Sequence, residues 1–270
     1  MRILHYIKGV FSNVFRDILL LVISIVSIYI LIFLYLPIIL SISTIFFSRQ
    51  ISIDVVTTSL PILLRSFEVA LVSTFLTVII AIPISYSISF YLGSVEKAIV
   101  SILIIAPYWV GTLLKTYSLA YLIYVVENLL NVRILYTETS IYLGIIYNYT
   151  PMAIIPILLA MDRIDRIYVD TARVIGAKGV NLVFRVILPM SSPGLLSSFV
   201  LVFTGSLGEL VIPQVLGGSP RYMIGQWVYE LAFFYKRFAE ASVISLIYLL
   251  TTLVMIGVVS RGIGSRRVML

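Results

Sequence analysis

Residues 162–189, DRIDRIYVDTARVIGAKGVNLVFRVILP, form the densest cluster of charge in a chain that is otherwise mostly apolar. Apolar side chains recur at helical spacing in the first half of this stretch, which predicts a short amphipathic helix. Gly176 follows, and because glycine has no Cβ it permits the sharp turn that ends a helix. A second short helix is predicted over residues 181–188, ending at Pro189. We therefore expect a compact knob that offers a docking surface to a soluble partner.

The segments on either side of this knob are apolar enough to lie in a membrane. Hydrophobic residues make up 61% of the 270 residues and charged residues 11%, whereas soluble domains carry about 25% charged residues. The chain has room for about six spans of roughly 20 residues each. Composition therefore predicts an all-α integral membrane protein with a transmembrane domain over residues 18–260.

Six transmembrane helices are expected within that domain, each bounded by polar or charged residues. Their approximate limits are 18–47, 66–92, 98–125, 140–161, 191–216 and 241–259. The expected connections outside the knob include polar loops over 48–65, 126–140 and 217–240. Prolines interrupt four of the six spans, and such breaks are tolerated where neighbouring helices or a wet cavity satisfy the freed backbone groups.

Both ends of the chain are expected on the cytoplasmic side of a cell membrane. Residues 1–17 predict an amphipathic helix in the headgroup region, with a frayed tail as the alternative. Residues 261–270 predict a cytoplasmic tail. With the N-terminus inside, 12 of the 19 lysines and arginines lie on the cytoplasmic side, 6 lie outside and Lys115 lies within a span. This bias favours the inside orientation and attributes the net charge of +7 to membrane loops rather than to nucleic-acid binding.

The residue inventory argues against an enzyme. Cysteine is absent and His5 is the single histidine, so neither a histidine-based catalytic pair nor a metal cluster is expected. An integral-membrane acyl- or glycosyltransferase needs convergent acids or histidines at one membrane face, and the acids here are scattered. The sequence also lacks the Gly-x-x-x-x-Gly-Lys-Ser/Thr loop of ATPases, so a nucleotide would be bound by another protein. A transporter or a channel remains.

The knob resembles the cytoplasmic coupling loop of permease subunits of ABC importers. That pattern is Glu-Ala-Ala, three residues, Gly, nine residues, Ile-x-Leu-Pro. Here the corresponding residues, with every spacing kept, are Asp170, Thr171, Ala172, Gly176, Val186, Ile187, Leu188 and Pro189. The resemblance implies that an ATPase subunit, which binds ATP and Mg, receives this loop in a groove. Asp170 would then lie near the helix start, where it favours the positive dipole end or meets a partner arginine.

Two further stretches resemble the spermidine/putrescine branch of these permeases. The third span carries Pro107-Tyr108-Trp109 and then Lys115, where that branch usually has arginine. The fifth span carries Gly208-Glu209-Leu210-Val211-Ile212-Pro213 followed by Leu216-Gly217-Gly218. This match favours polyamines over iron, thiamine, sulfate or molybdate as cargo. The resemblance implies three partners, namely ATPase subunits, a second, paralogous permease and an extracellular or periplasmic binding protein, and no cofactor bound by this chain.

Intramembrane charges are the candidates for a substrate pathway. A charge near the bilayer centre costs about 2.5–3.5 kcal/mol on insertion scales, so it usually faces a cavity or a partner. Glu209 would offset the hydration lost by a cationic polyamine, or would instead pair with Lys115 on another helix. Tyr108 and Trp109 would stack on an alkylammonium chain, or would serve as packing and interfacial residues.

Overall fold

The structure is a computed structural model that describes residues 2–47, 53–218 and 222–264. Within these ranges all regular structure is helical, which confirms the all-α expectation. The α-helices are α1 (Arg2–Phe47), α2 (Ile53–Tyr91), α3 (Ser94–Ile105), α4 (Thr112–Leu130), α5 (Glu138–Asp162), α6 (Arg166–Val174), α7 (Val180–Leu182), α8 (Leu188–Met190), α9 (Ser192–Leu207), α10 (Ile224–Tyr229) and α11 (Phe238–Gly264). Shorter turns are the 3₁₀-helix η1 (Ala106–Trp109) and the π-helices η2 (Val183–Ile187), η3 (Pro213–Gly217) and η4 (Glu230–Phe234).

The centre of the bundle is formed by α2, α5 and α9, which pack against one another, while α11 covers α9 and α2. Small residues line the contacts between these helices. In lipid the hydrophobic effect does not drive helices together, so their association depends on close packing, which small side chains permit. On α2, for example, Ser73, Thr77 and Ala81 are fully buried. The Thr77 hydroxyl donates to the Ser73 carbonyl within its own helix at 2.7 Å, so that its polarity is satisfied locally.

The tightest crossing of α5 and α9 lies at Gly194. A Cβ there would lie 2.5 Å from the backbone oxygen of Pro156 and 2.4 Å from the Cβ of Ala160. Because a backbone atom cannot swing aside, Gly194→Val should lower the stability of the folded chain by about 1–3 kcal/mol. The thermal midpoint of the detergent-purified protein measures this. The matched control is Gly257→Val, since a Cβ at Gly257 meets no atom within 4 Å; equal midpoints for the two variants would contradict the packing argument.

Four helices of the described residues are long and apolar enough to cross a membrane, and the number rises to six if each bent helix pair is one span. The fourth expected span, 140–161, is confirmed by α5. The six-span count itself stays a prediction.

Two expected loops proved wrong where the structure describes them. Residues 53–65, assigned to a polar loop, are the first turns of α2, because Val55 and Leu63 are buried against the helices that follow the fifth span. The segment 217–240 is largely helical, as α10 and η4, and its Ile224 and Leu231 share that same core. The polar residues here belong to helices that pack at the end of the bundle away from α6 and α7, not to chain without structure.

The third and fifth spans are broken rather than continuous. The third turns by 94° between Trp109 and Thr112, where Pro107 and Gly111 interrupt the helix. The fifth ends at Leu207, not at residue 216, and the chain turns at Gly208 before η3 begins. We call these two breaks the corner at Gly111 and the corner at Gly208.

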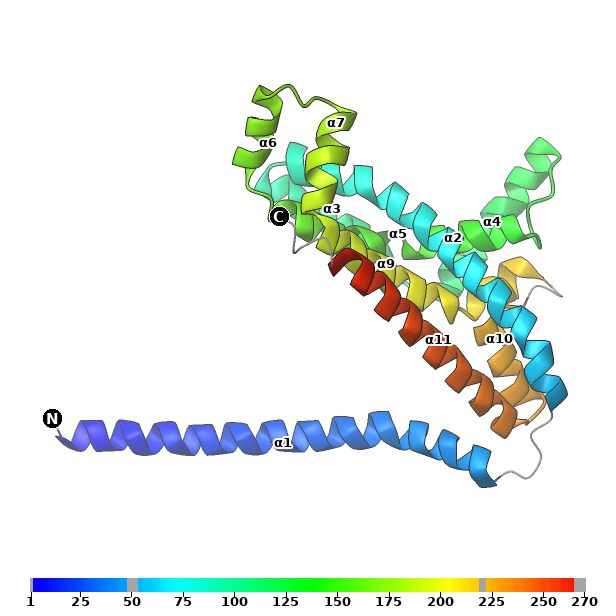
Figure 1. Cartoon of the computed structure of the whole chain (residues 1–270), viewed down its shortest axis with the longest axis horizontal. Coiled ribbons are helices and arrows are strands. Elements are labelled where there is room, and N and C mark those ends of the chain that lie inside the picture. The colour runs from blue at the N-terminus through cyan, green and yellow to red at the C-terminus, as the bar shows by residue number, and fades with distance from the viewer. Residues whose placement is uncertain (1, 48–52, 219–221, 265–270) are drawn as a thin grey trace.

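The N-terminal helix expected over residues 1–17 is helical from Arg2 but is not a separate element. It continues without a break into the first span as α1, a helix of 46 residues. In Figure 1, α1 extends as a long rod apart from most of the bundle, and it contacts α11. The tail 261–270 lies largely outside the described residues.

Candidate functional site

The knob projects from one end of the bundle, as Figure 1 shows for α6 and α7. Its first helix, α6, begins after Asp165, whose carboxylate accepts a hydrogen bond from the Ile167 amide at 3.0 Å and so caps the helix. At the other end Gly176 has a φ of +98°. The Gly176 amide donates to Arg173 and the Ala177 amide donates to Ala172, which is the Schellman arrangement that glycine closes. The predicted role of Gly176 as the end of this helix is confirmed.

The second half of the knob differs from the expectation in one respect. Pro189 does not end the helix, because α7, η2 and α8 run on to Met190 and a 76° bend then leads into α9. In η2 the Leu188 amide donates to the Val183 carbonyl, five residues earlier, so the turn is wider than in an α-helix. This width makes room for the ring of Pro189, which in an α-helix would collide with the carbonyl four residues before it.

The inner face of the knob belongs to the main hydrophobic core. Val169 of α6, Leu182 of α7 and Ile187 of η2 cluster with Ile157 and Met161 of α5. The same cluster contains buried residues of α2 and α9. The knob and parts of the three central helices therefore form one packed unit.

The outer face of the knob exposes large apolar side chains among charged ones. The exposed large side chains are Ile167, Tyr168, Val174, Ile175, Val180 and Phe184, with Val174 87% and Ile175 81% exposed. Asp170 lies in the middle of α6, not at its start, so the expected dipole role falls to Asp165 instead. The Asp170 carboxylate pairs with Arg173 at 3.3 Å, and both side chains are largely solvent-exposed.

Glu209 lies at the corner where the fifth span opens. Its Oε1 accepts hydrogen bonds from the amides of Leu210 (3.2 Å) and Val211 (3.1 Å), and its Oε2 accepts one from the Tyr149 hydroxyl (2.7 Å). The residue is buried. Its carboxylate thus satisfies backbone donors that the helix break leaves free and joins α5 to the corner.

Lys115 lies in the first turn of α4, where its amide donates to the Gly111 carbonyl at 3.2 Å. Its side chain is buried, and its ammonium nitrogen lies 5.8 Å from the centre of the Tyr108 ring, in cation–π geometry. No ion pair of the described residues joins Lys115 to Glu209. The expected interhelical salt bridge is therefore absent from the described residues, and the partner of Glu209 is Tyr149.

The remaining candidate, Trp109, is not brought into this group. It is 84% exposed on the outside of the corner between η1 and α4. Tyr149, by contrast, was missed from the sequence, where nothing distinguished it from the other tyrosines. No sequence signal could have found it, because the close contact of its ring with Gly205, where a Cβ would lie 2.5 Å away, exists only in the folded chain.

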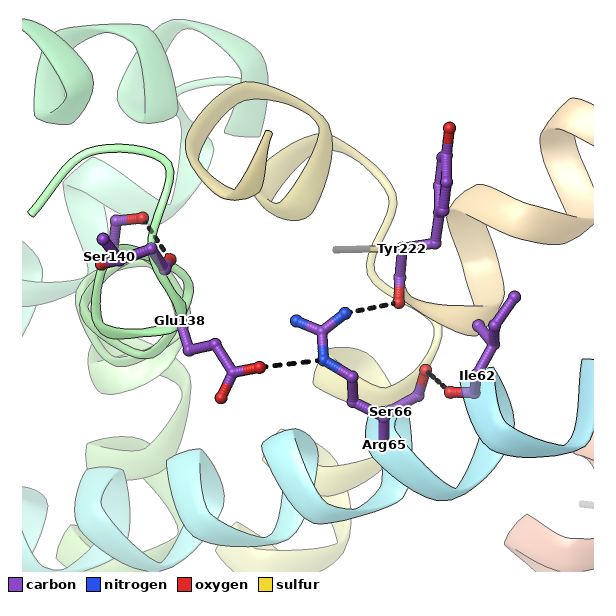
Figure 2. A network of polar contacts seen from close by, with 7 residues as sticks. Ile62, Arg65, Ser66, Glu138, Ser140 and Tyr222 are labelled. Atoms are coloured by element: carbon purple, nitrogen blue, oxygen red, sulfur yellow. Dashed lines mark hydrogen bonds and ion pairs between the residues drawn. The ribbon is translucent and has the colours of Figure 1, made fainter. Parts of the chain in front are cut away.

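The corner at Gly208 is closed by a second glycine. A Cβ at Gly225 would lie 2.2 Å from the Gly208 carbonyl oxygen, so the start of α10 packs directly on the backbone of the corner. Hydrogen bonds join the segment before α10 to α2. Figure 2 shows that Arg65 of α2 donates to the Tyr222 carbonyl (3.1 Å) and to Glu138 of α5 (3.2 Å). The Ile224 amide donates to the Ser66 hydroxyl at 2.7 Å.

An apolar helix bundle with an exposed amphipathic knob at one end and buried charges at two helix breaks defines an integral-membrane transport subunit. The comparison with protein families identifies which one. Residues 5–268 match the family described as binding-protein-dependent transport system inner membrane component, and the chain belongs to that family. It is accordingly an inner membrane component of a binding-protein-dependent transport system.

Relatives with known names are similar to this chain in sequence, and a solved structure shares its fold. The Escherichia coli (strain K12) spermidine/putrescine transport system permease protein PotB is 25% identical over 175 residues, which cover 61% of this chain and 63% of PotB. The Haemophilus influenzae PotB is 27% identical over 196 residues, covering 66% and 68%. A crystal structure of a bacterial alginate ABC transporter, in complex with an alginate pentasaccharide-bound periplasmic protein, shares the fold with a TM-score of 0.67 at 20% identity, covering 95% of this chain and 97% of that one.

Proposed function

We propose that this chain is the permease subunit of an ATP-driven importer of polyamines, the spermidine and putrescine class. The observation that carries the coupling part of the proposal is the knob. It keeps the full spacing from Asp170 to Pro189, exposes large apolar side chains, and shares one core with the central helices. A rigid-body motion imposed on this face by an ATPase would pass into α5, α2 and α9.

The docking surface that we propose consists of the exposed side chains of α6 and α7 with the residues that shape them. Asp170, Thr171, Ala172, Gly176, Leu188 and Pro189 carry the family pattern. Exposed apolar residues would supply the area buried on docking. The Asp170–Arg173 pair lies at the rim, where a solvated ion pair contributes little to stability by itself and its carboxylate is available to a basic partner.

The polyamine part of the proposal rests on the buried corner and on the relatives. The PotB proteins are named for spermidine and putrescine transport, and Glu209 offers a buried carboxylate at a helix break. A carboxylate can replace water around an ammonium group, which lowers the cost of moving a cation through a low-dielectric region. Tyr108 and Lys115 complete this pathway, whereas Trp109, at 84% exposure, would face lipid or a neighbouring subunit.

The complete importer that we propose contains two permeases, ATPase subunits that bind ATP and Mg, and an external binding protein. The knob and both termini would lie in the cytoplasm, in agreement with the excess of basic residues there. Figure 1 supports this arrangement to the extent that α11 ends on the side of the bundle from which the knob projects.

The test is uptake into proteoliposomes that contain the complete complex. ATP-dependent accumulation of spermidine or putrescine, without accumulation of iron, thiamine, sulfate or molybdate, is the expected result. Uptake without ATP would instead identify a passive facilitator. Uptake of one of the other solutes would retain the importer and remove the polyamine assignment.

A further inference from the structure

The first half of the third span, α3, is held loosely against the rest of the bundle. The structure describes every residue of α3, and none of them is buried. Val100 and Ile104 pack against the main core but stay partly exposed. A cavity of about 600 Å³ lies between α3 and α2, and one of about 290 Å³ lies between α3 and α5. Close-packed interiors leave few such gaps, so α3 has room to shift relative to its neighbours.

A polar cluster fastens the base of α3 to the ends of α2 and α5. The Lys97 ammonium of α3 donates to a carboxylate oxygen of Asp162 on α5 at 2.6 Å and to the Ser89 carbonyl of α2 at 3.3 Å. The Ser89 hydroxyl donates to the same Asp162 oxygen at 2.6 Å. We call Ser89, Lys97 and Asp162 the clasp. Its hydrogen bonds form a closed ring, and those to the charged groups are of the stronger, charge-assisted kind.

The clasp lies where the knob begins. Asp162 is the last residue of α5, and Asp165, three residues later, caps α6. The short turn between α2 and α3 ties α3 to α2 but not to α5. At its other end α3 continues through η1 into the corner at Gly111. The helix α3 is thus a rod with one end fastened beside the knob and the other end at a bend of the third span.

The clasp contributes little to the stability of the fold. The side chains of Lys97 and Asp162 are 25% and 29% exposed. Water screens an ion pair of this kind, and fixing the long lysine chain costs conformational freedom. Buried side chains of the main core already join the knob to α5, α2 and α9. What the clasp adds is a directional attachment for α3, which has no buried side chain of its own.

We propose that the clasp is a coupling link in which Lys97, as a positioning residue, makes the base of α3 follow the knob, so that a motion imposed by the ATPase reaches the corner at Gly111. This inference rests on the proposed ATP-driven import, and it adds α3 to the helices that the knob moves through the core. Without the clasp the knob and its core still move, but α3, flanked by two cavities, does not follow them. ATP is then hydrolysed with little transport.

The first experiment measures spermidine uptake and ATP hydrolysis together in proteoliposomes that contain the complete complex. Lys97→Met and Asp162→Asn are each expected to lower the uptake per ATP hydrolysed by about three- to tenfold, a common size for a change in coupling between sites. The double variant should lose no more than either single variant, because all three remove the same interaction. A purely structural role would lower uptake and hydrolysis together and leave their ratio unchanged.

Glu96→Gln is the matched control for this experiment. Glu96 lies beside Lys97 in the first turn of α3, and its carboxylate accepts from the Gly93 amide at the start of the same helix at 3.1 Å. Glutamine keeps an oxygen that can accept this bond, while a charge is lost one residue away from the clasp. The ratio of uptake to hydrolysis should therefore stay at the level of the unmodified complex.

The second experiment follows α3 directly and does not depend on the cargo. The chain contains no cysteine, so Leu103→Cys on α3 and Arg163→Cys after α5 place a pair of spin labels at two exposed positions. The complete complex is labelled in nanodiscs, with any cysteines of its other subunits replaced. The distribution of distances between the labels is expected to be narrow with the clasp intact and broader in Lys97→Met.

The outcomes separate the coupling link from the proposed function. An unchanged ratio of uptake to hydrolysis, losses that multiply in the double variant, or label distributions of equal width with and without Lys97 would each overturn the coupling link and leave the proposed function intact. If the unmodified complex shows no ATP-dependent uptake of spermidine, the proposed function fails and the coupling link fails with it.

Discussion

Gly176→Val is expected to lower ATP-driven uptake strongly while leaving membrane insertion intact. Gly176 has a φ of +98°, which a β-branched residue adopts only under strain of about 1–3 kcal/mol. No atom lies within 4 Å of a Cβ placed there, so the effect is on backbone conformation and not on packing. Loss of the turn would misplace the face formed by Ile167, Val174 and Ile175, and uptake should fall by about ten- to a hundredfold.

The measurement compares uptake with binding of the ATPase subunits in a pull-down of the complete complex. Gly176→Asn should be intermediate, since asparagine tolerates positive φ better than other residues. Gly93→Val is the matched control: Gly93 lies at the start of α3 with an ordinary φ of −69°, and a Cβ there would only touch Glu96 at 3.7 Å. Normal uptake by Gly176→Val would contradict the docking role of the knob.

The second large effect is expected from Glu209→Gln. This replacement keeps the size of the side chain and an oxygen that can accept from Leu210 and Val211, but it removes the negative charge. Because an interaction with a charged group is worth about 1.5–3 kcal/mol, polyamine transport should fall by about ten- to a hundredfold. The measurement is spermidine uptake by proteoliposomes at several substrate concentrations.

Two controls separate charge from structure in that experiment. Tyr149→Phe removes the hydrogen bond to Oε2 but leaves the charge and the ring that packs on Gly205, so its effect should be smaller than that of Glu209→Gln. Glu68→Gln removes an exposed acid of α2 and should leave uptake unchanged. Unaltered uptake by Glu209→Gln would leave its carboxylate a purely structural cap of the helix break.

The knob was the most predictable part of the chain because its features are local. Helical spacing, a glycine and a fixed pattern of residues are all read within 28 residues, and the Schellman turn at Gly176 follows from them. The membrane spans were predictable in kind for the same reason. Whether each span is a continuous helix could not be predicted. Pro61 and Pro83 lie inside the intact helix α2, whereas the chain turns near Pro107 and at Gly208. The packing that decides between these outcomes cannot be read from the sequence alone.

The site at the helix breaks depended on contacts that no short window contains. Glu209 was recognised as a buried acid beside a glycine, but its partner Tyr149 lies 60 residues away. The expected alternative was a salt bridge to Lys115, a residue of opposite charge, but no ion pair of the described residues joins the two. Likewise Arg65 was assigned to a loop, because its contacts with Glu138 and Tyr222 exist only once α2, α5 and the segment before α10 have come together.

At 46 residues, α1 is about 69 Å long, more than twice the hydrocarbon thickness of about 30 Å. No residue of its apolar 18-residue window is buried by the rest of this chain. A free monomer would therefore leave this window solvated by acyl chains, and detergent would have to coat it when the protein leaves the bilayer. Yield and dispersity on extraction should consequently depend on whether a second subunit is expressed alongside.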